Sequence, residues 1–273
     1  MSYKTILVNI DIDGPVVPVV GLATGLAARF DAKLVGFCAA DAPLPMAGPD
    51  GAGLAAEVWQ QLREDVERRH KELHAEFNRI VAGSVETEWR QALDSPTRAL
   101  ATASRLADLV VMSAPRGAST GNAYRAADPG SVVLQAGRPI LVAGESAGQA
   151  LAKTVVIAWK DTREARRAVA DAVPLLLSAS EVIVVTVDPA PDDWIAAGIA
   201  DVAEFLIRHG IKPRTEVVEA TNEGEKLSEF VASCHADLIV SGAYGHSRLR
   251  EWVFGGVTRS LLDQVGLNRF MSS

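Results

Sequence analysis

The stretch KTVVIAW at residues 153–159 repeats the stretch KTILVNI at residues 4–10, and this repetition decides the fold. Both stretches are short, β-branched and almost continuously apolar, which is typical of a strand buried on both faces of a parallel sheet. A second pair, DLVV at 108–111 and DLIV at 237–240, has the same character. The offset is 149 residues for the first pair and 129 for the second. The chain is therefore predicted to contain two copies of one unit, the first with a longer loop and helix.

Each copy alternates predicted strands with predicted helices. In the first copy the strands are expected at 5–10, 33–38, 85–90, 108–112 and 138–143, and in the second at 153–159, 181–187, 214–219, 237–240 and 269–272. This alternation predicts an α/β fold in which two tandem Rossmann-like domains each contain a five-stranded, doubly wound parallel sheet. Domain 1 is expected to span 1–147 and domain 2 to span 148–273, joined by a small, polar linker at 144–149.

The bulk composition fits a chain of this kind. Its 273 residues are enough for two domains, and hydrophobic and charged fractions of 48% and 22% are ordinary for a globular protein. The net charge of −7 disfavours nucleic acid as a partner. Two distant cysteines, no leader pattern and no long apolar run predict a cytoplasmic protein without a membrane partner.

The segment after the strand at 237–240 is the main candidate for chemistry. From Ser241 to Thr258 it reads SGAYGHSRLREWVFGGVT, with glycines spaced G-x2-G-x9-G. In open α/β sheets a ligand binds beyond the carboxyl ends of the strands at the switch point, here between the first and fourth strands. Glycines allow close backbone approach, and Gly255–Gly256 precede a predicted helix at 257–265 whose N-terminus suits an anion. The alternative is a loop that only turns the chain and caps this helix.

The combination of the first strand, the DLVV and DLIV strands and the glycine loop resembles the universal stress protein family. The resemblance covers nearly the whole chain, twice over. It implies domains that pair about a pseudo-two-fold axis with their fifth strands adjoining. Some members of the family bind ATP, which Mg²⁺ could accompany, and others do not.

On this resemblance, twelve residues of the second copy are expected to contact a nucleotide. They are Ala158, Lys160, Val187, Gly242, Gly245, His246, Ser247, Arg248, Gly255, Gly256, Val257 and Thr258. Two of them depart from the family pattern. Gly256 replaces a serine or threonine, although Thr258 lies close by, and Lys160 stands where an aspartate accompanies the adenosine. A lysine can contact a phosphate but cannot accept a hydrogen bond.

The first copy shows the opposite losses. Asp11 stands where the family has its aspartate, and Gly130–Ser131 resemble the end of the motif. The front of its loop contains Pro115, which has no N–H to donate, and lacks the first glycine. Asp11, Gly130 and Ser131 are therefore weaker candidates, and the alternative for Asp11 is a helix cap or loop carboxylate.

No catalytic residue and no metal site are predicted. His70 and His74 are four residues apart on the predicted helix 54–81, but dense charge around them favours a solvated face. Cys38 and Cys234 are expected to be inert. The five tryptophans are scattered along the chain, which favours roles in packing or at an interface.

These observations predict a stress-response sensor or regulator rather than an enzyme. It is expected to bind ATP or another phosphate-bearing ligand mainly in the second copy, and to act on a protein partner whose identity the sequence does not specify. A homodimer of tandem chains is also expected. One alternative is a nucleotide-independent interaction module of the same fold, which the Gly256 and Lys160 departures favour. The other is a slow ATPase.

Overall fold

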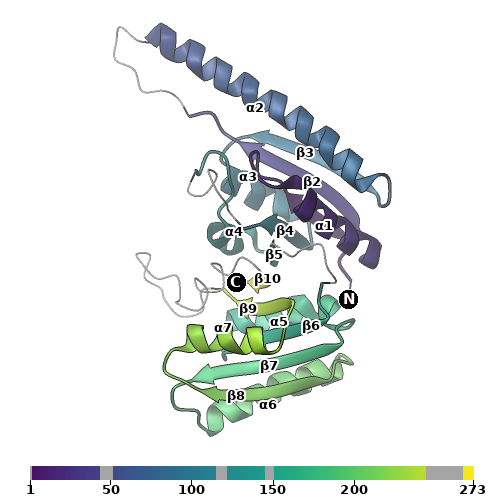
Figure 1. Cartoon of the computed structure of the whole chain (residues 1–273), viewed down its shortest axis with the longest axis vertical. Coiled ribbons are helices and arrows are strands. Elements are labelled where there is room, and N and C mark those ends of the chain that lie inside the picture. Colours follow the sequence, from purple (N-terminus) through teal and green to yellow (C-terminus); the bar gives the residue numbers. More distant parts are fainter. Residues whose placement is uncertain (1, 44–51, 115–121, 145–150, 244–266) are drawn as a thin grey trace. The chain divides into compact units, whose positions relative to one another are not determined.

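A computed structural model describes residues 2–43, 52–114, 122–144, 151–243 and 267–273 (Figure 1). Its contacts divide the chain into a first unit, Tyr3–Ala136, and a second unit that comprises mainly Gly137–Ser273. The boundary predicted from the sequence repeats lies at 147/148, whereas the boundary between the two compact units lies at 136/137. The segment 137–147 therefore belongs to the first repeat but to the second unit.

The first unit contains four parallel strands in the order β3-β2-β1-β4. The strands are β1 (Thr5–Asn9), β2 (Lys33–Ala40), β3 (Thr87–Leu93) and β4 (Leu109–Ser113). The helices are α1 (Val16–Phe30), α2 (Ala52–Val81), α3 (Pro96–Ala103), the short 3-10 helix η2 (Ser104–Leu106) and α4 (Pro129–Ala136). α1 packs against α2 and α3 packs against α4, as two helix pairs do on opposite faces of a doubly wound sheet.

The second unit contains five parallel strands in the order β8-β7-β6-β9-β10. They are β6 (Thr154–Ala158), β7 (Glu181–Asp188), β8 (Pro213–Glu219), β9 (Leu238–Gly242) and β10 (Asn268–Ser272). The helices of its described part are α5 (Arg163–Leu176), α6 (Asp193–Arg208) and α7 (Glu223–Ser233), and α6 and α7 lie on opposite faces of the sheet (Figure 1).

The fifth strand of the first repeat, β5 (Ile140–Ala143), belongs to the second unit. It pairs antiparallel with β10, with Leu141 opposite Phe270. The sheet of this unit is therefore mixed, although most of its pairs are parallel. The adjoining fifth strands and the α/β fold of two Rossmann-like repeats confirm the fold predicted from the sequence.

The aspartate of each DL(V/I)V motif has a structural role. Asp108 accepts hydrogen bonds from the backbone N–H groups of Lys4 and Thr5, at 2.7 and 3.0 Å. Asp237 does the same for Ala152 and Lys153, at 2.8 and 2.8 Å. Each carboxylate thus ties the start of the fourth strand to the start of the first, which explains why the motif recurs.

The face of α2 that packs on the sheet corrects one expectation. His70 is only 2% exposed, because it follows the spacing of Val66, Leu73 and Phe77 along the buried face. The prediction of a solvated face was therefore wrong for His70, and burial lowers the pKa of its imidazole. His74 stacks on Trp89 with ring centroids 5.0 Å apart.

Candidate functional site

The switch point of the second repeat lies where β6 and β9 end side by side. Ala158 of β6 is in register with Ser241 of β9, so the glycine loop leaves the sheet beside residues 159–161. The N–H of Trp159 donates to the carbonyl of Val185 at 2.8 Å, which extends the ladder by one residue and fixes the direction of the chain there.

Alternation along the strands divides these residues between two faces of the sheet. Ala158 and Val187 pack in an apolar cluster with Leu227 and Val231 of α7. Ile239, two residues before Ser241, belongs to the same cluster. Ala158 and Val187 therefore share the α7 face, to which residues two apart on a strand both point, whereas Gly242 lies against α5.

Lys160 is held on this side by an ion pair. Its Nζ lies 2.5 Å from Glu223 Oε2, in the first turn of α7, and its side chain is 44% exposed. The ammonium is therefore positioned at the strand end, but a carboxylate of the chain competes with any phosphate for it. Such a half-exposed pair is worth only about 0–1 kcal/mol, so it can exchange partners.

Ser241 is a residue that the sequence analysis missed. Its side chain is 6% exposed, and its Oγ is buried without a hydrogen-bond partner in the described part of the chain. A buried hydroxyl normally has a partner, because leaving it without one costs about 1–3 kcal/mol. The signal in the sequence was its place, directly before the first glycine of the loop.

Gly242 is required by packing against α5. A Cβ built at Gly242 would lie 2.5 Å from the backbone nitrogen of Ala165 and 2.7 Å from the carbonyl carbon of Glu164. The absence of a side chain therefore lets β9 pass the first turn of α5, and ligand contact is not needed to explain this glycine. The other eight candidates from Gly245 to Thr258, namely Gly245, His246, Ser247, Arg248, Gly255, Gly256, Val257 and Thr258, lie outside the described residues.

At the switch point of the first repeat, the described polar groups bind one another. Asp11 is 8% exposed, and its Oδ1 accepts hydrogen bonds from Asn9 Nδ2 at 2.9 Å and from the N–H of Ala127 at 3.1 Å. Burial raises the pKa of Asp11 to about 6, because its effect is larger than that of these two hydrogen bonds, which lower the pKa. Arg125 pairs with Asp13 nearby and lowers the pKa of that carboxyl.

The start of α4 in the first repeat already has an anion. Asp128 Oδ2 accepts a hydrogen bond from the N–H of Ser131 at 2.7 Å, and Gly130 is buried. A carboxylate therefore stands where the resemblance would put a phosphate. Among the described residues of the first repeat, the start of α4 therefore does not fit a phosphate group.

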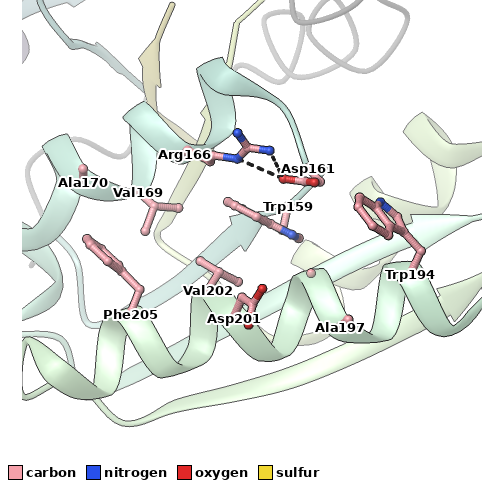
Figure 2. Close-up of a pocket in the computed structure, with 11 residues that line it drawn as sticks. Trp159, Asp161, Arg166, Val169, Ala170, Trp194, Ala197, Asp201, Val202 and Phe205 are labelled. Carbon is pink, nitrogen blue, oxygen red and sulfur yellow. Dashed lines mark hydrogen bonds and ion pairs between the residues drawn. The ribbon is translucent and has the colours of Figure 1, made fainter.

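A cavity of about 420 Å³ lies on the other face of the second repeat, between α5 and α6 (Figure 2). It is lined by Trp159 and Trp194, two tryptophans that the sequence analysis treated as scattered. None of the described candidates for nucleotide binding lines it. Among the residues that the structure describes, no cluster of three or more His, Cys, Asp or Glu could hold a metal.

The comparisons with known proteins agree with this architecture. Residues 193–266, which include the whole glycine loop, match the model of the universal stress protein family. Within the second repeat, the chain is therefore similar to the universal stress protein family. The matched segment lies in the second repeat, and the first repeat has the same fold. No curated protein matches the chain by sequence.

Solved universal stress proteins share the whole architecture. A universal stress protein from Archaeoglobus fulgidus DSM 4304 is 13% identical, with a TM-score of 0.78 and 99% of this chain and 96% of that chain covered. A proposed universal stress protein from Pseudomonas aeruginosa UCBPP-PA14 is 16% identical, with a TM-score of 0.63 and 99% and 93% covered. A protein of unknown function from Pseudomonas aeruginosa PAO1 is 14% identical, with a TM-score of 0.59 and 99% and 92% covered. At these identities the likeness shows the fold.

No described helix is both long and apolar enough to cross a membrane.

Proposed function

We propose that this universal stress protein is a cytoplasmic stress-response regulator that binds ATP at the second repeat and does not hydrolyse it quickly. Members of the family have been solved in complex with cAMP and with dAMP. The observation that carries the proposal in this chain is the hydroxyl of Ser241. It is buried at the start of the glycine loop and has no partner among the residues described.

The groups around Ser241 suit an adenine nucleotide. Val187 and Ala158 supply apolar surface on the same face, and Lys160 supplies a cation that a phosphate would draw from Glu223. Mg²⁺ would accompany the phosphates. Slow turnover is expected because the sequence predicts no general base, nucleophile or metal cage at this site.

Calorimetric titration with ATP tests binding at the site, and a separate assay of ADP release tests turnover. A Gly245→Asp/Gly255→Asp variant places two carboxylates in the second glycine loop, and a Gly117→Asp/Gly121→Asp variant makes the same charge change in the first copy. We expect one ATP per chain, lost in the first variant and retained in the second. Ser241→Ala should weaken ATP about three- to tenfold, the value of one hydrogen bond, without lowering the free energy of unfolding.

The other outcomes select the alternatives. If the wild-type protein does not bind millimolar ATP, the chain is better explained as a nucleotide-independent interaction module. Steady release of ADP that the Gly245→Asp/Gly255→Asp variant abolishes would make it a slow ATPase.

A further inference from the structure

We infer a second binding site in the cavity between α5 and α6, which takes a small organic cation with a flat apolar body. The cavity volume of about 420 Å³ falls within the range of small-molecule sites. Its walls are mostly apolar, with Val169 from α5 and Val202 and Phe205 from α6. Figure 2 shows Trp159 between the two helices, with Phe205 toward one end and Trp194 toward the other.

The cavity exists because α6 presents small side chains to Trp159. Ala197 and Gly198 line it, and a Cβ added at Gly198 would meet only Trp159 Nε1 at 3.7 Å and Asp161 Cβ at 4.0 Å. In the first repeat, by contrast, α1 packs directly against α2. The second repeat thus leaves open a space that a larger residue at Gly198 would fill.

The charges at the cavity select a cation. Asp161 Oδ1 accepts two hydrogen bonds from Arg166, at 2.9 and 2.5 Å, so these two charges largely neutralise one another. Asp201 is exposed and has no ion-pair partner in the part of the chain that the structure describes. Among the described residues, the charged groups that line the cavity are therefore one guanidinium and two carboxylates, with one carboxylate left over.

The two indole rings favour the same ligand. Trp159 is 7% exposed, whereas Trp194 is 71% exposed, an unusual exposure for so large an apolar side chain. Flat apolar ligands stack on indole faces, and cations are attracted to those faces. A fused ring that carries an amine would satisfy the rings and Asp201 together.

This site is separate from the proposed nucleotide site. Lys160 reaches α7, whereas Trp159 and Asp161, on either side of it, line the cavity between α5 and α6. The two sites therefore share no candidate among the described residues, and ligand binding at one can be tested without the other.

Three probes with the same naphthalene ring test the inference: 2-(1-naphthyl)ethylamine, 2-(1-naphthyl)ethanol and 1-naphthaleneacetate, which are cationic, neutral and anionic. Calorimetry gives the affinities. Fluorine NMR of the full chain labelled with 5-fluorotryptophan gives the location, because signals of Trp159 and Trp194 should move and those of Trp59 and Trp89 should not. We expect the amine to bind most tightly and the acetate most weakly.

Two variants and their matched controls complete the test. Gly198→Leu should abolish binding of all three probes, whereas Ala200→Leu, on the exposed side of α6, should leave it unchanged. Asp201→Asn should weaken the amine about two- to fivefold without weakening the alcohol, whereas Glu204→Gln should weaken neither. Both α6 leucine variants add a good helix former, so folding should be kept.

The inference is overturned if no probe moves the Trp159 and Trp194 signals, or if folded Gly198→Leu protein binds as the wild type does. Equal affinity for the amine and the acetate would overturn the choice of a cation.

Discussion

At the end of β1, the carboxyl group of Asp11 is buried among its own hydrogen-bond donors. Asn9 and the backbone of Ala127 donate to it, but burial still raises its pKa to about 6. Its charge therefore opposes folding at neutral pH, while its oxygen holds the segment before α4 against the strand. The stability of the protein should therefore depend on the ionisation of Asp11.

Asp11→Asn should change the pH dependence of stability. A raised pKa in the folded state means that stability from the protonated form is complete below the ordinary pKa of 3.8 and is lost as pH rises through about 6. The asparagine keeps an acceptor for Ala127 and cannot ionise. In urea unfolding, the variant should gain up to about 3 kcal/mol over the wild type between pH 3.5 and pH 7.

Asp13→Asn is the matched control, with the opposite sign. The hydrogen bond from Arg125 lowers the pKa of Asp13, so the wild type should hold its advantage over this variant above the ordinary pKa and lose it as pH falls. If the Asp11→Asn and wild-type stability curves run parallel from pH 3.5 to 7, Asp11 is not ionising as described.

Among the described elements, β9 approaches the start of α5 more closely at Gly242 than any other described glycine approaches its neighbours. Gly242→Ala would bring Cβ within 2.5 Å of backbone that cannot rotate away, so α5 or β9 must shift. We expect a loss of at least about 1–3 kcal/mol in the free energy of unfolding, measured with and without ATP. Gly198→Ala, in the middle of α6, meets no such contact and should be neutral or stabilising by up to about 1 kcal/mol.

A Gly242→Ala protein as stable as the wild type, but unable to bind ATP, would contradict this assignment and give Gly242 a direct role in the ligand site.

For the whole molecule, the pairing of β5 with β10 makes the second unit depend on a strand from the first repeat. Phe270 and Met271 of β10 are fully buried, opposite Leu141 and Ile140. A fragment of residues 137–273 should therefore have a higher free energy of unfolding than a fragment of 148–273, by at least about 2 kcal/mol in urea unfolding. The shorter fragment exposes these side chains at an edge strand.

The longer fragment with Val142→Pro provides the control, because proline removes a ladder N–H in β5 and should lower stability toward that of the shorter fragment. Equal stability of the two unmodified fragments would mean that β5 adds nothing to the second unit.

The sequence alone determined the repeat and the fold, because strands buried on both faces must be apolar throughout and the helices between them must follow a 3.6-residue period. The recurring DLVV and DLIV stretches located the switch point, and the glycine spacing pointed to the family. Lys160 and Val187 were assigned to one site by resemblance, which stays a prediction, and the structure places both beside α7.

Only the tertiary structure decided what surrounds each side chain. His70 is buried because its neighbours one turn away are apolar, although the charges around it in sequence indicated water. Trp159 and Trp194 are 35 positions apart in the chain but line one cavity, since α6 folds back across the end of β6. Gly242 is packed against α5, Ser241 has a buried hydroxyl and Asp11 has a raised pKa. The apolar spacing around His70 is present in the sequence, but the other features depend on distances between segments remote in sequence, which no local pattern encodes.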